Sequence, residues 1–357
     1  MREIIKNKGS VYCNSGAWNS FNKELEKLNP TKVFVLTDTH TKKLCTSLFF
    51  TRYTFTITPI ILEIPEGETH KNITTCLTLW KELSEKGADR NSIIINLGGG
   101  VVTDLGGFVA STFKRGIEFI NIPTSLLAMV DASVGGKNGV DLGLLKNQVG
   151  VINNPKFVII DTQFLKTLPD NQKTSGYAEM LKHGLIHSKE YWSKVKTLNE
   201  TNIEDIEELL WESVQIKNNI VTQDPFEKGL RKTLNYGHTL GHAIESYGLS
   251  DNKTKPLLHG EAVAIGMILT TYISNKILGF PEEILEDVSS SIFKKFKKVD
   301  FDTSEIDEII KLLIYDKKNT NGKVLFVLLN DIGNHKINCE VPNDTILAAF
   351  DYYKNYK

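Results

Sequence analysis

Ser92-Ile-Ile-Ile-Asn-Leu-Gly-Gly-Gly-Val-Val-Thr-Asp-Leu-Gly-Gly107 is the stretch of sequence that decides the fold. A strand-forming run leads into three glycines, and an apolar, helix-like stretch follows. This order predicts a turn in which backbone N–H groups can approach a pyrophosphate, with the helix dipole assisting. The spacing is not the G-x-G-x-x-G fingerprint, so a tight turn without a ligand is the competing interpretation. Asp104 would either hydrogen-bond a ribose or nicotinamide group or cap the helix.

Around this stretch, the hydrophobic pattern changes near residue 165. Before that point, short runs that are apolar on nearly every residue alternate with helical segments, which indicates a parallel sheet covered on both faces. The runs are Lys32–Thr37, Thr54–Thr58, Ser92–Leu97, Glu118–Ile122 and Lys156–Asp161. After it, apolar residues recur at helical spacing in Ile206–Lys217 and Ala262–Leu269, and a hairpin is expected at Lys323–Leu329 and Lys336–Cys339.

These patterns predict an α/β fold with two domains. Residues 1–165 would form a Rossmann-like parallel-sheet domain, and residues 166–357 a mostly α-helical, metal-binding domain, with a cleft expected between them. A chain of 357 residues is long enough for two cores.

The composition excludes several classes of protein. The chain has 42 Lys plus Arg against 43 Asp plus Glu, a formal net charge of −1, whereas proteins that bind nucleic acid or anionic membranes carry a basic excess. The four cysteines are scattered, which argues against a disulfide framework. No apolar run approaches the roughly 18 residues of a membrane span. We therefore expect a cytoplasmic protein with neither a nucleic-acid nor a membrane partner.

Five of the eight histidines, including His238, His242 and His259, lie in one segment of the second domain. His238 and His242 are four residues apart and would share one face of a helix, and His259 is expected to open another helix. Glu179 would complete a set of two imidazoles and one carboxylate with open positions, as catalytic zinc requires. A single histidine is more often a core residue than a ligand, so it is the clustering that favours a metal site.

Basic residues follow small or glycine-rich turns in the same part of the chain. Lys137 comes after Gly135-Gly136 and can point into a cleft without crowding from its backbone neighbours. The other candidates are Arg115, Lys146, Lys182, Lys217, Arg231, Lys317 and Lys318. Solvated surface lysine is the alternative for each. Several positioned cations beside a metal would suit a small substrate that carries phosphate and carboxylate.

Taken together and in order, these motifs resemble the 3-dehydroquinate synthase family of sugar phosphate cyclases. The resemblance runs from Pro65 to Asn319, and its most specific stretches are Gly98–Asp104, Asp131–Lys137, Gly229–His242 and His259–Ala264. It implies a homodimeric lyase of the shikimate pathway that uses NAD and Zn2+ or Co2+. The implied reaction converts 3-deoxy-D-arabino-heptulosonate 7-phosphate to 3-dehydroquinate and phosphate through transient oxidation, phosphate elimination, re-reduction and aldol closure.

The resemblance also implies roles for individual residues. Metal ligands would be Glu179, His238 and His259. Cofactor contacts would come from Asp38, Glu68, Lys71, Gly99, Gly100, Val101, Asp104, Thr124, Ser125, Asp131, Lys137 and Lys146. Substrate contacts would come from Arg115, Asp131, Lys137, Lys146, Asn147, Lys182, Lys217, Arg231, Asn235, His242 and either Lys317 or Lys318. Catalytic roles would fall to Lys137, Lys182, Glu227, Arg231, Asn235 and His242, and Arg115 would reach across a dimer interface.

The chain departs from the family pattern at several positions. Thr103, Ser125 and Asn138 replace residues that are common in the family, and Asp224-Pro225 replaces an Asp-Glu pair. Asp141 stands where asparagine is common, which exchanges a neutral amide for a carboxylate near an expected anion site.

Three other functions remain open at this point. One is another sugar phosphate cyclase, whose substrate lacks the carboxylate that Arg231 and Lys217 would hold. A second is a metal-dependent polyol or alcohol dehydrogenase, which needs fewer phosphate-binding lysines. The third is a metal-stabilised binding module, in which the glycine turn and the cations would have no functional role.

Overall fold

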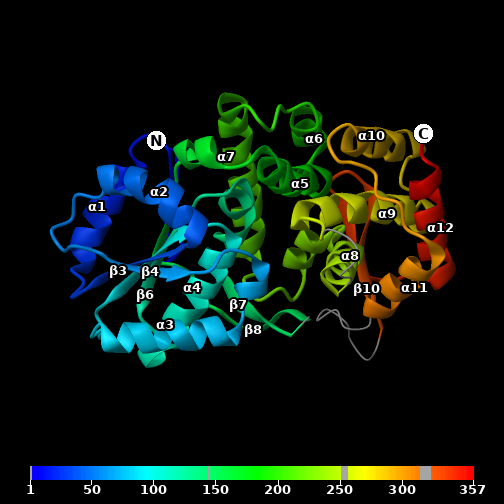
Figure 1. Ribbon diagram of the computed structural model, residues 1–357. Helices are drawn as coiled ribbons and strands as arrows, with labels where there is room; N and C mark the ends of the chain where they lie inside the picture. Colours follow the sequence, from blue (N-terminus) through cyan, green and yellow to red (C-terminus); the bar gives the residue numbers. More distant parts are fainter. Residues whose placement is uncertain (1, 144, 251–255, 314–322) are drawn as a thin grey trace. The chain divides into compact units, whose positions relative to one another are not determined.

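The computed structural model describes residues 2–143, 145–250, 256–313 and 323–357. The chain divides into two compact units (Figure 1). Unit 1 consists of Met1–Lys173 and Leu210–Asn218, and unit 2 consists of Thr174–Leu209 and Asn219–Lys357. Helix α7 (Ile203–Gln223) therefore supplies its middle residues to unit 1 and both of its ends to unit 2.

Unit 1 is built on a seven-stranded sheet in the order β1-β2-β9-β6-β5-β3-β4. The strands are β1 (Arg2–Ile4), β2 (Ser10–Cys13), β3 (Val33–Asp38), β4 (Ile60–Ile64), β5 (Ile93–Gly98), β6 (Glu118–Pro123) and β9 (Phe157–Ile160). Strand β1 is antiparallel to β2, and the other neighbouring pairs are parallel. The chain passes from β3 outward to β4, and then from β5 to β6 in the opposite direction. Ligands of such sheets bind beyond the carboxyl ends of the strands where this direction reverses.

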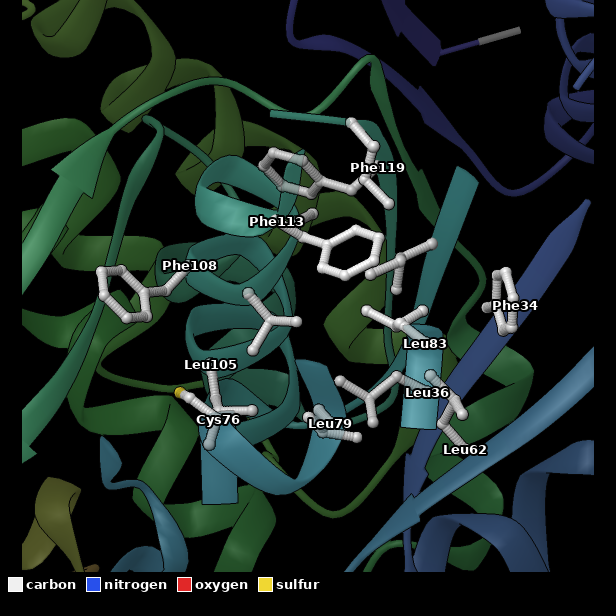
Figure 2. Close-up of a cluster of buried hydrophobic side chains, with 14 of the residues drawn as sticks. Phe34, Leu36, Leu62, Cys76, Leu79, Leu83, Leu105, Phe108, Phe113 and Phe119 are labelled. Carbon is white, nitrogen blue, oxygen red and sulfur yellow. The ribbon is translucent and has the colours of Figure 1, made fainter. Parts of the chain in front are cut away.

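Four helices pack on this sheet: α1 (Ala17–Leu28), α2 (Thr39–Arg52), α3 (Ile73–Glu85) and α4 (Gly100–Thr112). Every residue of β5 and β9 is buried. Because successive side chains of a strand point to opposite faces, both faces of the sheet are covered at these strands. Figure 2 shows one of the resulting apolar clusters, in which Phe34 and Leu36 of β3 lie with Leu79 and Leu83 of α3. The predicted α/β class with a parallel, Rossmann-like sheet is confirmed.

One predicted strand is wrong. Thr54–Thr58 forms an irregular connection after α2, and the strand begins instead at Ile60, beyond Pro59. Burial decides between the two segments, because Leu62 and Ile64 are the residues whose side chains enter the apolar cluster. The run before the proline has no comparable buried apolar pair.

Close packing explains the Gly106-Gly107 pair of α4. A Cβ atom on Gly106 would lie 2.0 Å from Oδ1 of Asn96 in β5. A Cβ atom on Gly107 would lie 1.9 Å from Oδ1 of Asn138 in β7 (Lys137–Leu142). The helix that follows the glycine turn therefore approaches two strands at distances that only glycine permits.

Strands β7 and β8 (Leu145–Ile152) form a separate antiparallel hairpin in unit 1, which the sequence patterns did not predict. Gly139 pairs with Gly150 in its middle, and every residue of β8 is exposed or half-buried. Neither strand contains the continuous apolar run that marks the buried strands of the main sheet. The polar side chains of this hairpin instead contact other parts of unit 1, as Lys146 does with Glu68 and Asn147 with Lys71.

Unit 2 is mostly helical, as predicted. Its helices are α5 (Asp170–His187, which begins in unit 1), α6 (Lys189–Val195), the ends of α7, α8 (His238–Ser250), α9 (His259–Leu278), α10 (Glu282–Phe293), α11 (Thr303–Leu312) and α12 (Asn343–Asn355). The predicted helical stretches lie within α7 and α9. The expected hairpin is formed by β10 (Leu325–Asp331) and β11 (Asn334–Glu340), which pair antiparallel.

Within the described ranges, none of the helices has the length and apolar character needed to cross a membrane. All four cysteines lie in these ranges, and each is buried and without a disulfide.

Candidate active-site clusters

The glycine turn has the predicted form. Gly98 ends β5, and Gly99 caps α4 without a side-chain hydrogen bond. The first N–H groups of a helix have no partner within the helix, and together with the helix dipole they form a site for an anion. A Cβ atom on Gly99 would lie 3.2 Å from Oγ of Ser125, so the loop after β6 lies beside the turn. The turn and this loop bring together five predicted cofactor residues: Gly99, Gly100, Val101, Thr124 and Ser125.

Asp38 lies at the carboxyl end of β3, the strand next to β5. Its side chain accepts a hydrogen bond from the backbone N–H of Thr41 at 2.7 Å and caps α2. The structure therefore places Asp38 at the same edge of the sheet as the glycine turn, at the reversal of strand order.

A second group, made of five predicted site residues and Asp141, surrounds Lys71, and we call it the Lys71 cluster. It consists of Glu68, Lys71, Asp104, Asp141, Lys146 and Asn147. The Lys71 ammonium lies 2.7 Å from Oδ2 of Asp104 and 2.8 Å from Oδ1 of Asn147. The Lys146 ammonium lies 3.0 Å from Oε1 of Glu68, which is itself 3.8 Å from the Lys71 ammonium. Asp104 does not cap α4, because the cap position is Gly99.

Three carboxylates determine the charge state of Lys71, which is 4% exposed. Burial alone would lower the pKa of Lys71, but the carboxylates of Asp104, Glu68 and Asp141 outweigh burial and raise the pKa. Lys71 is therefore charged at every physiological pH, and it donates hydrogen bonds to Asp104 and Asn147 within the cluster.

Asp131 and Lys217 meet within unit 1, although they are far apart in the sequence. Asp131 lies in a short π-helical turn (Ala128–Ala132), and Lys217 comes from the part of α7 that belongs to unit 1. The Lys217 ammonium lies 2.7 Å from Oδ1 of Asp131 and also donates to the Asp131 carbonyl. Lys217 is buried, so this ion pair is held in a defined geometry.

The remaining predicted cations are placed separately. Lys137 begins β7 and is half-buried. Arg115 is exposed, with a left-handed backbone (φ 71°), in the turn that precedes β6. Lys317 and Lys318 lie outside the described residues.

In unit 2, the predicted metal ligands meet in one cluster. We call Glu179, Lys182, His238, Glu245 and His259 the Glu179 cluster. Glu179 lies on α5 and is fully buried, and the two histidines are the first residues of α8 and α9. Close contact between α9 and α5 sets this geometry, because a Cβ atom on Gly260 would lie 1.9 Å from the carbonyl oxygen of Ser175.

The distances in this cluster suit a zinc or cobalt ion. Oε1 of Glu179 lies 3.2 Å from Nε2 of His238 and 3.3 Å from Nε2 of His259. In a tetrahedral site with bonds of about 2.0–2.1 Å, neighbouring donor atoms are about 3.3 Å apart. Oε2 of Glu179 accepts a hydrogen bond from Lys182, which leaves Oε1 as the oxygen directed toward both imidazoles.

Each imidazole has a second partner that orients its ring. Nδ1 of His238 lies 3.0 Å from the carbonyl oxygen of Tyr236, and Nδ1 of His259 lies 3.1 Å from Oε2 of Glu245. A carbonyl or carboxylate oxygen accepts an N–H, so in both rings Nδ1 carries a proton and Nε2 faces Glu179. The residue that sequence reasoning missed is Glu245, although its spacing from His238 and His242 (seven and three residues) places all three on one face of α8.

The charges of this cluster depend strongly on one another. Burial would raise the pKa of Glu179, but Lys182 and His238 outweigh it and lower the pKa well below its usual value. Burial lowers the pKa of His238. For His259, burial also favours the neutral ring, but the carboxylates of Glu245 and Glu179 raise its pKa to about 10.

His242 follows His238 by one turn of α8, and their ring centroids are 5.2 Å apart. The rings of His242 and His259 are 5.8 Å apart, so a third imidazole lies beside the predicted ligands. Donor atoms of His238, His242 and His259 come within 4.8 Å of one another, which makes His242 an alternative ligand to Glu179. We favour Glu179 because its Oε1 lies 3.2 Å from Nε2 of His238 and 3.3 Å from Nε2 of His259, as expected for donors of one tetrahedral site.

The loop before α8 holds three more predicted residues. The buried Arg231 donates from Nη1 to the carbonyl oxygen of Pro225 at 2.7 Å. Nδ2 of Asn235 donates to Oε1 of Glu227 at 2.7 Å. Asp224 accepts hydrogen bonds from the backbone N–H groups of Gly229 and Arg231, so its carboxylate determines the course of the loop.

Comparison with known proteins identifies the family. Residues 61–175 match the family model described as 3-dehydroquinate synthase N-terminal, and residues 176–319 match the model described as 3-dehydroquinate synthase C-terminal. The 3-dehydroquinate synthase of Parabacteroides distasonis is 44% identical over 332 residues, which cover 92% of this chain and 93% of that protein. This chain belongs to the 3-dehydroquinate synthase family. The family member from Campylobacter hominis is 39% identical over 290 residues, or 81% of this chain and 83% of that protein.

Two solved structures have folds similar to that of this chain. The 2-epi-5-epi-valiolone synthase of Streptomyces hygroscopicus, in a structure with NAD+ and Zn2+ bound, matches with a TM-score of 0.85 and 23% identity over 99% of both chains. A 2-deoxy-scyllo-inosose synthase, solved with carbaglucose-6-phosphate, NAD+ and Co2+, matches with a TM-score of 0.81 and 24% identity over 97% of this chain and 96% of that chain. The fold of the 3-dehydroquinate synthase family is thus shared with other sugar phosphate cyclases.

Proposed function

We propose that this chain is a 3-dehydroquinate synthase that converts 3-deoxy-D-arabino-heptulosonate 7-phosphate to 3-dehydroquinate and phosphate. The observation that carries the proposal is the convergence of Glu179, His238 and His259, in a chain that is 44% identical to a 3-dehydroquinate synthase over 92% of its length. The proposed cofactors are NAD and Zn2+ or Co2+. When bound, NAD would exchange a hydride at C5 of the substrate and the metal would act as a Lewis acid toward its hydroxyl groups.

We assign the dinucleotide to the glycine turn and the Lys71 cluster. The N–H groups at the start of α4 would hold the pyrophosphate, and Asp38 would lie toward the adenosine end. The carboxylates of Glu68 and Asp104 are suited to accept hydrogen bonds from hydroxyl or amide groups, and the Lys71 ammonium lies 2.7 Å from Oδ2 of Asp104 and 3.8 Å from Oε1 of Glu68. Residues 1–165 are accordingly proposed as the NAD-binding domain, and residues 166–357 as the domain that carries the metal.

The proposed substrate carries a phosphate and a carboxylate, and different cations are assigned to each. Lys137, Lys146, Asn147 and Lys182 would hold the phosphate, with Arg115 contributed by a second copy of the chain. Arg231, together with Lys217, would hold the carboxylate, since a guanidinium can grip a carboxylate with two hydrogen bonds. The contacts of Lys217 with Asp131, and of Arg231 with Pro225, support this assignment because they hold both cations in defined positions.

The proton transfers are assigned to the substrate and to His242. Oxidation at C5 acidifies the neighbouring C6 proton, and the substrate's own phosphate can accept that proton as it leaves. His242 is proposed to assist proton movement, and its ring lies beside those of His238 and His259. Asn235 and Glu227, which are hydrogen-bonded to each other, would complete the catalytic set.

One assay tests this function. The heptulosonate phosphate is supplied with Zn2+ and NAD well below the substrate concentration, and phosphate release is followed together with NADH absorbance. We expect phosphate release without NADH accumulation, and its loss when a chelator removes the metal. NADH formed in proportion to substrate, with no phosphate, would contradict the proposal and indicate a dehydrogenase.

A parallel assay addresses the other cyclases. Sedoheptulose 7-phosphate and glucose 6-phosphate lack the carboxylate that Arg231 and Lys217 are proposed to hold. We expect phosphate release from neither. Efficient turnover of either sugar phosphate would instead place the chain with the valiolone or inosose synthases.

The family also supports a cytoplasmic homodimer as a proposal. The four buried cysteines, which form no disulfide, support a reducing compartment. Light scattering of the purified protein would test the dimer, and fractionation of the source cells would test the location.

A further inference from the structure

Lys71, Asp141 and Asn147 form a closed ring of three hydrogen bonds. The backbone N–H of Asp141 donates to the carbonyl oxygen of Lys71 at 2.9 Å. The backbone N–H of Asn147 donates to Oδ1 of Asp141 at 2.7 Å, and the Lys71 ammonium donates to Oδ1 of Asn147 at 2.8 Å. The three residues come from the segment before α3, from β7 and from β8. The ring therefore joins the β7–β8 hairpin to the segment that carries Glu68 and Lys71.

The ring holds Asn147 in an unusual conformation. Asn147 has a φ of 51°, in the left-handed region that residues other than glycine rarely adopt. Such a conformation persists only where the surrounding structure holds it. The bond from its N–H to Asp141 supplies that support, and the side chain of Asn147 is then directed to the Lys71 ammonium.

The same geometry places the neighbouring Lys146. Lys146 is adjacent to Asn147 in β8. Its ammonium lies 3.0 Å from Glu68, so this contact also links the β7–β8 hairpin to the segment that carries Glu68 and Lys71. Asp141 thus contacts both other residues of the ring: its backbone N–H donates to Lys71, and its side chain accepts from Asn147.

Side-chain chemistry separates two roles that Asp141 could have. An asparagine at this position could accept the same hydrogen bond from the N–H of Asn147, so the ring does not require a negative charge. The carboxylate adds a third negative charge that faces Lys71, beside those of Asp104 and Glu68. A role in geometry and a role in charge therefore predict different results for the substitution of Asp141 by asparagine.

We propose that Asp141 is a positioning residue, which acts through its hydrogen bond to Asn147 to hold Glu68, Lys71, Lys146 and Asn147 in the arrangement that binds the dinucleotide. This inference rests on the proposed function for the identity of the ligand. The proposal also explains why a carboxylate can lie near an expected anion site, because Oδ1 of Asp141 accepts the backbone N–H of Asn147.

Two variants test the inference. D141A removes the acceptor and opens the ring, and D141N retains an acceptor while removing the charge. NAD+ binding is measured by calorimetry on the metal-loaded full chain, and amide hydrogen exchange is followed in residues 145–152. For D141A we expect NAD+ affinity to fall about 10- to 100-fold and exchange in the hairpin to become faster, since a buried hydrogen bond and its preorganisation are lost. For D141N we expect affinity within about threefold of the parent and unchanged exchange.

Other results would overturn the inference. An affinity of D141A within threefold of the parent would show that the ring does not position the binding residues. A loss in D141N as large as that in D141A would show that the charge of Asp141, and not its geometry, is what matters. Because D141N retains every hydrogen bond of the ring, a loss of NAD+ affinity of more than threefold in D141N would overturn the inference even if D141A does not fold.

A matched control is available at the other end of the sheet. Asp89 lies before β5, and its side chain accepts the N–H of Asn91 at 2.9 Å in a turn of unit 1. D89A should leave NAD+ affinity unchanged. If the parent binds NAD+ but releases no phosphate from the heptulosonate phosphate, the proposed function fails while the comparison of D141A with D141N still stands.

Discussion

The Lys71 cluster and the Glu179 cluster are both groups of charges around a buried residue, and the two central residues have opposite signs. In the first, a lysine is surrounded by the carboxylates of Glu68, Asp104 and Asp141. In the second, a glutamate is surrounded by the ammonium of Lys182 and the imidazoles of His238 and His259. The surrounding groups also differ in kind, because carboxylates remain ionised at neutral pH whereas imidazoles can lose a proton.

The kind of surrounding group, carboxylate or imidazole, determines what each cluster is able to bind. The carboxylates of the Lys71 cluster can accept hydrogen bonds from hydroxyl groups. The cluster contains no imidazole, so it offers a metal no nitrogen ligand of the kind found in zinc sites. In the Glu179 cluster, an imidazole that loses its Nε2 proton offers a lone pair beside Glu179, so a divalent metal and protons compete for the same atoms. One cluster is therefore suited to a nucleotide and the other to a metal. The following substitutions test that division.

We expect the largest effect from Glu179→Gln. The amide removes the central charge, takes the compensating negative charge away from the buried Lys182, and removes an anionic ligand. Metal content after dialysis should fall to background, and kcat should fall by roughly 10³-fold or more. The control is Glu200→Gln, since Glu200 is also a buried carboxylate of unit 2, paired with Lys295 at 2.6 Å. Normal metal content in Glu179→Gln would show that Glu179 is not a ligand.

The corresponding change in the other cluster is Lys71→Met. It leaves several carboxylates near one another without their central cation, and breaking a buried ion pair in this way costs about 3–5 kcal/mol of unfolding free energy. Denaturant unfolding should show this loss, and NAD+ binding should weaken, while metal content stays at the parent value. Loss of metal from Lys71→Met would contradict the independence of the two clusters.

Lys137→Ala tests a cation outside both clusters. If Lys137 stabilises the charge that develops on the phosphate, its removal should lower kcat about 10²- to 10³-fold. The thermal unfolding midpoint should change little, because Lys137 is half-buried at the start of β7. Turnover close to that of the parent would show that this residue has been given the wrong role.

Glu245 allows the orientation of a ligand to be tested apart from the ligand itself. Glu245→Leu removes the acceptor for Nδ1 of His259, and loss of such a partner typically weakens metal binding about 10- to 100-fold. Glu245→Gln keeps an acceptor and should lose less. Competition with a zinc chelator and the absorption spectrum of the Co2+ form measure the effect. Equal zinc affinity in the parent and in Glu245→Leu would show that Glu245 has no part in holding His259.

The smallest effect is expected from a carboxylate that is not enclosed in either cluster. Hydrogen bonds from backbone N–H groups lower the pKa of Asp224 below its ordinary value of 3.8, despite the opposing effect of burial. A carboxyl group whose pKa is lowered by folding stabilises the protein above pH 3.8, and this contribution is lost as the pH falls below that value. Asp224→Asn should therefore be slightly less stable than the parent at pH 7, and the difference should shrink as the pH falls below 3.8. A constant difference across this range would exclude the charge as its cause.

Local patterns predicted most of the fold. The helix that follows Gly98-Gly99-Gly100, the shared helix face of His238 and His242, and the helix start at His259 depend on neighbouring residues, and all are present in the structure. The predicted strand at Thr54–Thr58 failed because burial against α3 favours the residues after Pro59. The β7–β8 hairpin was missed because its side chains are not continuously apolar.

The sequence by itself determined the class of fold, the kinds of donor and charge available, and the family. Only the tertiary structure decided how these groups are paired. Asp131 meets Lys217, Lys71 meets Asn147, and Glu245 meets His259, across separations of 86, 76 and 14 residues. The hydrophobic periods of helices and strands relate residues that are only a few positions apart in the sequence. Contacts between distant residues depend instead on how whole helices and strands pack. The charge of a buried group depends on the same contacts, so packing also decided that Lys71 stays protonated and Glu179 ionised.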